Sequence, residues 1–176
     1  MSDEELFDRL YEAHLPDLRA FIYRRIPPAQ VDDVVAETFL VAWRRIAEVP
    51  AEPRPWLFGI ARRVMLTTRT QGRWLALQVR LAAEPPGRPQ ELAGDVAARL
   101  DLTRAWSRLT AGEREVLSLI AWDGLTVAEA ATVLGCQPGT FRMRLMRARR
   151  HLLHILDRLP AVEAWPLHPV TEGVRP

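Results

Sequence analysis

The stretch Leu125–Arg150, LTVAEAATVLGCQPGTFRMRLMRARR, contains two short helical patterns separated by a tight break. Thr126 followed three residues later by Glu129 forms a capping box, which predicts that a helix begins there. Gly135 predicts the end of that helix, because glycine accepts the left-handed conformation of a helix C-terminus without a steric penalty. Pro138 favours the first turn of a second helix, where its missing N–H costs no hydrogen bond. The first helix is expected to bury Ala128, Ala131 and Leu134.

The second helix of this stretch has two faces of different chemistry. The residues expected to pack inward, at helical spacing, are Phe141, Leu145, Ala148 and Leu152. The residues on another side are Arg142, Met143, Met146, Arg147 and Arg150, with Gln137 and Thr140 at its N-terminal end. The pattern is typical of a helix-turn-helix, in which the first helix braces the second against the major groove of DNA.

The charge of the second helix also points to DNA. The residues from Arg142 to Arg150 include five arginines and no acid. A planar guanidinium can grip a guanine edge or a phosphate through two hydrogen bonds. A solvated basic helix without a ligand is the plainer interpretation. The capped helix, the glycine turn and the five arginines together favour DNA binding.

The composition sets further bounds. A chain of 176 residues that is 48% hydrophobic and 26% charged can bury a core and does not have a disordered composition. All 24 basic residues are arginine, which GC-rich codon usage explains more simply than nucleic-acid binding does. The single cysteine, Cys136, excludes an internal disulfide. No signal peptide or membrane-length apolar run is present, so we expect a soluble, cytoplasmic protein without membrane insertion.

The N-terminal part predicts two helices. The first spans residues 3–26, and Pro16 predicts a kink or a break in it. The second runs from about Ala29 to Val49, and its expected inward residues are Val31, Val35, Phe39, Ala42, Trp43 and Ile46. Its outer side carries carboxylates near the N-terminus, where the helix dipole favours them: Asp32, Asp33 and Glu37.

A third helix is expected from about Pro55. Its predicted buried stripe is Trp56, Leu57, Ile60, Ala61 and Val64. Its remaining surface carries the arginines Arg62, Arg63, Arg69 and Arg73, interspersed with Thr67, Thr68, Thr70 and Gln71 and followed by Trp74. Arginines with a terminal aromatic suit single-stranded nucleic acid, since charge follows the backbone and a ring stacks on a base. The solvated outer face of a bundle helix is an equally good interpretation of these residues.

The C-terminal part resumes after a proline-rich segment. Residues 76–95 are predicted to be a flexible linker, because AAEPPGRP cannot continue a helix. Helical periodicity returns with Val96, Leu100 and Trp106. A second capping box, Thr110 with Glu113, opens a helix that is expected to end at Asp123–Gly124. Its expected inward residues are Val116, Leu117, Ile120 and Ala121.

The patterns therefore predict an all-α fold. Two small helical domains, residues 1–75 and 96–159, are joined by the linker, and residues 160–176 form a proline-rich tail. The C-terminal domain contains the helix-turn-helix. No glycine-rich phosphate loop or catalytic constellation is apparent, so neither an enzyme nor a cofactor is expected. His151 and His154 lack further ligands at zinc-like spacing, so surface histidines near phosphate are preferred to a metal site.

Three segments resemble the extracytoplasmic-function (ECF) sigma factors of bacterial RNA polymerase, and the resemblance covers residues 7–159. DDVVAETFLVAWRRI, from Asp32 to Ile46, is similar to the family's polymerase-binding segment. PWLFGIARRVMLTTRTQGRW, from Pro55 to Trp74, is similar to its segment for the promoter −10 element. Residues 109–152 resemble its −35-reading domain. One such match would be weak, but three in the right order are specific.

The resemblance implies roles for individual positions. The residues implied to dock on the clamp of core RNA polymerase are Asp33, Glu37, Phe39, Leu40 and Trp43. Those implied to meet the −10 element, where the duplex opens and a base is flipped out, are Arg62, Arg63, Thr67, Arg69 and Arg73. Those implied at the −35 element are Thr140, Arg142, Met143, Arg144, Met146, Arg147 and Arg150. Of these, the residues expected nearer the phosphates are Thr140, Arg144 and Arg150.

The chain also departs from the family pattern at four positions. Ala36 stands where glutamine is frequent, Arg63 replaces a frequent asparagine, Thr67 a frequent aspartate and Met143 a small polar residue. These departures leave the promoter sequence open. The partners that the resemblance implies are core RNA polymerase, promoter DNA and, by analogy, an anti-sigma protein. The alternatives are a helix-turn-helix repressor or activator that acts without polymerase, and an enzyme or metal-dependent regulator.

Overall fold

The computed structural model describes residues 2–69 and 94–158, and all regular elements in these ranges are helical. The first group contains α1 (Asp3–Tyr23), α2 (Val31–Arg44) and α3 (Pro53–Arg69), with 3-10 turns η1 (Pro28–Gln30) and η2 (Ile46–Glu48) before and after α2. The second contains α5 (Gly94–Arg108), α6 (Ala111–Ala121), α7 (Val127–Leu134) and α8 (Pro138–Asp157). The all-α prediction is confirmed. Helix α5 begins two residues inside the expected linker, most of which lies outside the described residues, as do residues 160–176.

The local signals of the C-terminal group are confirmed. Thr110 caps α6 and Thr126 caps α7, each in a complete capping box with Glu113 and Glu129. Hydrogen bonds with Thr126 hold the pKa of Glu129 below its usual value. Gly135 ends α7 in the left-handed region at φ 64°. Pro138 occupies the first turn of α8. The helix-turn-helix therefore follows from short-range interactions within each segment.

Two predictions about the N-terminal helices need correction. A kink or a break was expected at Pro16, and the break does not occur, because α1 continues through this residue. Leu10, Leu18 and Phe21 are buried on both sides of Pro16, and their packing outweighs one missing hydrogen bond. The second helix is shorter than expected, because 3-10 turns replace its two ends.

Several residues expected in the core are exposed. Trp43 was expected to face inward but is 39% exposed, whereas Val34 and Thr38 fill the core below α2. Ala121 and Ala128 are also exposed, and neighbouring Leu119 and Ala130 are buried instead. In each case the predicted buried face of the helix is wrong by one or two residues. Small residues and residues near a helix end give a weak hydrophobic pattern, so the pattern does not define which side of a short helix faces the core.

Stacked aromatic rings join the N-terminal helices. The rings of Phe21 on α1 and Phe58 on α3 stack with centroids 4.2 Å apart, and both residues are fully buried. Leu57, Ile60 and Ala61 of the predicted stripe are buried, while Trp56 and Val64 are partly buried. The stripe on α3 is therefore largely confirmed.

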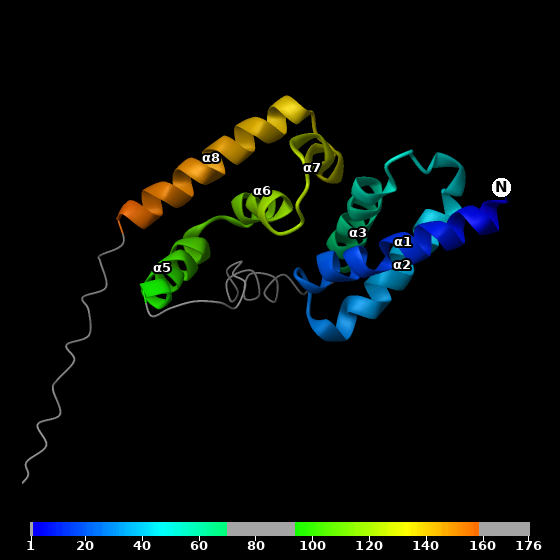
Figure 1. Ribbon diagram of the computed structural model, residues 1–176, viewed down its shortest axis with the longest axis horizontal. Coiled ribbons are helices and arrows are strands. Elements are labelled where there is room, and N and C mark those ends of the chain that lie inside the picture. Colours follow the sequence, from blue (N-terminus) through cyan, green and yellow to red (C-terminus); the bar gives the residue numbers. More distant parts are fainter. Residues whose placement is uncertain (1, 70–93, 159–176) are drawn as a thin grey trace, which may run out of the picture.

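The two helical groups pack directly on each other. Helix α3 lies against α7, which places the helix-turn-helix beside the N-terminal group in Figure 1. The helices meet at Gly59, where a Cβ would lie 3.7 Å from the Cα of Val133, an ordinary van der Waals contact. A side chain larger than that of alanine at position 59 would push the helices apart. None of the helices in the described ranges is long and apolar enough to cross a membrane.

One apolar face packs helix α8 against the other helices, and we call its residues, Phe141, Leu145, Ala148 and Leu152, the α8 seam. Phe141 and Ala148 are fully buried, Leu145 is buried and Leu152 is partly buried, as the spacing predicts. Helix α8 packs on α5, α6 and α7. The ring of Phe141 is the largest buried group of α8 and fixes which face of the helix remains outside.

We predict that Phe141→Ala lowers the free energy of unfolding of the C-terminal helices by about 3–5 kcal/mol, because it removes a buried ring and leaves a cavity. Met143→Ala is the matched control, since Met143 lies on the same helix but is 46% exposed. It should change this free energy by less than about 0.5 kcal/mol. Chemical denaturation followed by circular dichroism measures both. Equal losses would contradict the assigned seam.

Candidate nucleic-acid interface

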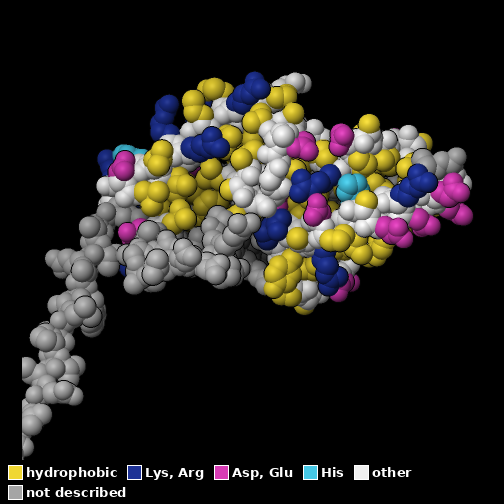
Figure 2. All heavy atoms as spheres, in the orientation of Figure 1, with side chains coloured by type: hydrophobic (Ala, Val, Ile, Leu, Met, Phe, Trp, Pro, Cys, Tyr) yellow, Lys and Arg dark blue, Asp and Glu magenta, His cyan; other side chains and the backbone are white. Residues whose placement is uncertain are grey.

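The outward face of α8 carries the residues predicted to contact DNA. Because Phe141, Leu145 and Ala148 are buried, the helix turns its other sides to solvent. The exposed side chains include every predicted −35 residue: Thr140, Arg142, Met143, Arg144, Met146, Arg147 and Arg150. In Figure 2 arginine and hydrophobic side chains share the surface over α8, whereas acidic side chains gather over the N-terminal end of α1.

The arginines of α8 have no acidic partner within the part of the chain that the structure describes. No ion pair joins any of the five arginines between Arg142 and Arg150 to a carboxylate. Arg144 and Arg147 line a groove with Glu113 and Glu115 without such contact. Exposed guanidinium groups without a partner are available to phosphates and base edges.

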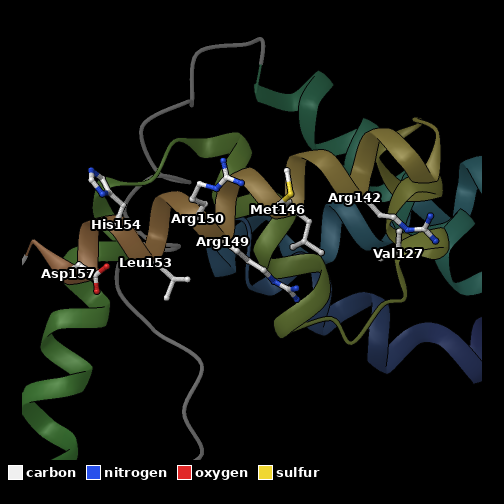
Figure 3. A pocket seen from close by; sticks show the side chains of 9 residues that line it. Val127, Arg142, Met146, Arg149, Arg150, Leu153, His154 and Asp157 are labelled. Carbon is white, nitrogen blue, oxygen red and sulfur yellow. The ribbon is translucent and has the colours of Figure 1, made fainter.

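An open groove runs along α8, and we call it the arginine groove. Its lining includes Val127, Arg142, Met146, Arg149, Arg150 and Leu153. Figure 3 shows these side chains following α8, with Val127 of α7 at one end and His154 and Asp157 at the other. The structure adds Arg149 to the set predicted from the sequence. Its spacing of seven residues from Arg142 is the helical signal that could have identified it.

The arginines of α3 lie in different environments. Arg62 is not free, because its Nε and one terminal nitrogen donate to the carboxylate of Glu115 on α6, at 2.7 and 3.1 Å. These hydrogen bonds raise the pKa of Arg62 above its ordinary value. Arg63 and Thr67 are exposed, and the Thr67 hydroxyl donates to the Arg63 carbonyl at 3.0 Å. The side chain of Arg69 and all of Arg73 lie outside the described residues.

A second groove lies between α1 and α2, and we call it the aromatic groove. Its lining includes Phe7, Tyr11, Ala36, Phe39, Leu40 and Trp43. Phe39 forms the floor and is buried, with its ring 4.7 Å from that of Tyr11, centroid to centroid. Leu40 and Trp43 are 42% and 39% exposed at the rim. The groove therefore offers apolar surface to a partner.

Carboxylates lie beside the aromatic groove. Asp33 and Glu37 are exposed on α2, and neither makes an ion pair with a described residue. Asp32 pairs with Arg19 of α1 at 2.6 Å. The polymerase-binding set predicted from the sequence is thus gathered on one helix, with four residues exposed and Phe39 beneath them.

One of the two histidines of α8 contacts α6. His151 Nδ1 lies 2.8 Å from Glu113 Oε1, in a contact with the capping box of α6 that the sequence did not predict. Burial opposes the shift, but hydrogen bonds with Thr110 and His151 hold the pKa of Glu113 below its usual value. No group of three or more His, Cys, Asp and Glu side chains within residues 2–69 and 94–158 is arranged to hold a metal ion.

Two family models match the chain in the order of its helical groups. Sigma-70 region 2 matches residues 10–75, and Sigma-70, region 4 matches residues 99–152. The chain is 37% identical to RNA polymerase sigma factor CnrH of Cupriavidus metallidurans over 150 residues, which are 75% of this chain and 76% of that relative. It is 32% identical to ECF RNA polymerase sigma factor SigL of Mycobacterium tuberculosis over 166 residues, 90% of this chain and 93% of that relative.

Solved structures with a similar fold come from the same class of protein. CnrH in complex with the cytosolic domain of CnrY has a TM-score of 0.57 at 28% identity, covering 86% of this chain and 87% of CnrH. The sigma factor RpoE in complex with the anti-sigma factor NepR, from Bartonella quintana, has a TM-score of 0.60 at 26% identity. This match covers 88% of this chain and 98% of RpoE.

Proposed function

Because this chain belongs to the ECF sigma factors, which bind core RNA polymerase and direct promoter-specific transcription, we propose that three of its surfaces divide that work. The observation that carries the proposal is a row of exposed arginines, on the second helix of a helix-turn-helix, that pair with no carboxylate of the described residues. The apolar docking groove lies in the other helical group. The proposed functional units are residues 1–75 and 96–159. In this proposal the polymerase, and not this chain, forms the phosphodiester bonds of the RNA. The proposed location is the cytoplasm.

The first surface is the arginine groove of α8, which we assign to the −35 element. The major groove is about 12 Å wide and admits one α-helix, whose N-terminal residues then meet base edges. Arg142 lies in the second turn of α8 and suits a guanine, whereas Arg149 and Arg150 lie farther along and suit phosphates. Met143 and Met146 would contact apolar groups such as thymine methyls.

The second surface is the exposed side of α3, which we assign to the −10 element. Arg63 and Thr67 are accessible for the backbone and bases of an opened strand. The proposal also includes Arg69 and Arg73, whose side chains lie outside the described residues. Arg62 is bound to Glu115 through its Nε and one terminal nitrogen, so that edge of its guanidinium can reach DNA only when this pair breaks.

The third surface is the aromatic groove with its carboxylates, which we assign to core polymerase. Trp43 and Leu40 supply exposed apolar area next to Asp33 and Glu37, so a basic, partly apolar helix would fit the surface. Ala36 lines the same groove, so the missing glutamine amide removes one polar contact but leaves the apolar surface intact.

Regulation by an anti-sigma protein is a further part of the proposal. The solved relatives CnrH and RpoE are bound to CnrY and to the anti-sigma factor NepR. The exposed apolar residues of both grooves are surface that such a protein could cover. No observation favours a regulator that acts without polymerase, because both sigma family models match this chain.

We predict that Arg142→Ala reduces discrimination at one −35 base pair by about 1–3 kcal/mol, because a bidentate contact to guanine is lost. Binding to core polymerase should not change. Arg158→Ala is the matched control, since Arg158 is exposed but follows the last turn of α8. Transcription from promoters mutated one −35 base pair at a time measures discrimination. A fall in polymerase affinity as large as the loss of discrimination would contradict the division of surfaces.

We predict that Asp33→Arg weakens binding to core polymerase about tenfold at low salt, because it reverses the charge beside the docking groove. Glu52→Arg is the control, since Glu52 is exposed outside α2. Co-elution with core polymerase and a fluorescence titration measure the affinity. If Asp33→Arg binds as tightly as the unmodified chain, the docking surface lies elsewhere.

A further inference from the structure

The arginine groove has an apolar end that promoter DNA does not cover. Leu153 in its lining is 60% exposed, more than any other large hydrophobic side chain of the described residues. It lies ~22 Å along α8 from Pro138, at 1.5 Å per residue. A recognition helix reads bases with its N-terminal turns, in a major groove about 12 Å wide. Leu153 therefore lies beyond the bases, where exposed apolar surface indicates a second partner.

The rest of the lining shows the chemistry of that partner. Met146 is 43% exposed, and Arg149 and Arg150 lie between it and Leu153 on the same side of α8 (Figure 3). Neither arginine pairs with a carboxylate within residues 2–69 and 94–158. A segment with one acid between apolar side chains would fit this surface.

The sequence that follows α8 has this pattern. Residues 159–167, LPAVEAWPL, contain one acid, Glu163, and no arginine. Val162 and Trp165 place apolar side chains on both sides of that acid. Trp165 precedes a proline, which favours an extended backbone over a helix. The segment is thus complementary to the groove in charge and in hydrophobicity.

The distances along the two segments also match. Helix α8 ends at Asp157, which lines the end of the groove, so residues 159–167 start beside it. At 1.5 Å per residue, Arg149 lies ~12 Å back from the end of α8 and Met146 ~17 Å. At 3.1 Å per residue, an extended segment places Glu163 ~12 Å from its start and Trp165 ~19 Å. A chain that reverses directly after α8 would therefore bring the acid to Arg149 and the indole to Met146.

We propose that residues 159–167 bind in the arginine groove and cover the −35 surface until promoter DNA displaces them. The inference rests on the proposed function, since the segment competes with DNA only if the groove reads the −35 element. The Glu163 carboxylate takes the place of a phosphate beside Arg149, and the Trp165 ring packs on the thioether of Met146. A short tether gives the segment an effective concentration in the millimolar range, so weak contacts suffice.

The consequence for transcription is a lower apparent affinity for promoters. If residues 159–167 cover about 80–90% of the molecules, the apparent dissociation constant rises about five- to tenfold. Discrimination between −35 sequences does not change, because every promoter has to displace the same segment. The effect therefore differs from that of Arg142→Ala.

The first experiment locates the segment in the full chain without DNA. Trp165→p-benzoylphenylalanine introduces a photoreactive ring, which should crosslink to Met146 or its neighbours on α8 within one molecule. Glu163→Arg in this background should lower the yield at least about threefold, because like charges then meet at Arg149. Glu172→Arg is the matched control, since it makes the same change of charge outside residues 159–167. Mass spectrometry of the digested chain maps the crosslinks.

The second experiment measures promoter binding by the complete holoenzyme. Trp165→Ala should tighten binding to a promoter duplex about five- to tenfold, because it frees the groove. Val174→Ala, an apolar change outside residues 159–167, should leave the affinity unchanged. Fluorescence anisotropy of a labelled duplex measures the affinity. The same duplex should also reduce the crosslink from position 165.

Several outcomes would overturn the proposal. It is wrong if no crosslink reaches α8, if the crosslinks join two chains, or if Trp165→Ala binds the duplex no more tightly than Val174→Ala. Failure of the proposed function would look different. The holoenzyme would then show no preference for any −35 sequence with either variant, while the crosslink from position 165 to α8 remained.

Discussion

The buried carboxylate of Asp123 is the constraint on which the placement of the two helical groups depends. Among the described residues its charge is paired with Arg24 and Arg25, which lie almost one hundred residues earlier in the chain. Burial lowers the pKa of Arg25 and Asp123 opposes that shift, so the pair has a solvation cost that only close contact offsets. The apolar contact of α3 with α7 adds to this polar contact.

The surfaces of the molecule follow from how each helix is anchored. Phe141 orients α8 so that its arginines face solvent and pair with no carboxylate in the described ranges, which a DNA-reading helix needs. Phe39 anchors α2 in the same way and leaves Leu40 and Trp43 at the rim of the aromatic groove. The buried residues are thus structural, and their exposed neighbours carry the assigned functions. The third surface, on α3, differs because Arg62 takes part in packing between the groups.

Features governed by neighbouring residues could be predicted from the sequence. The capping boxes at Thr110 and Thr126, the left-handed Gly135 and the inward seam of α8 each involve residues within about one or two helical turns. Predictions that needed distant contacts were less successful. The helix through Pro16 and the exposure of Trp43 depend on which other helices cover those positions, and a hydrophobic pattern does not specify its partner.

The sequence alone therefore determined the all-helical class, the helix-turn-helix and the sigma-factor family, because periodicity, capping and motif order are properties of contiguous residues. Only the tertiary structure decided which arginines are free. Arg142 and Arg62 look alike in the sequence, yet one is solvated and the other is bound to Glu115. The physical reason is that an ion pair across an interface depends on the distance between two helices, which no local pattern encodes.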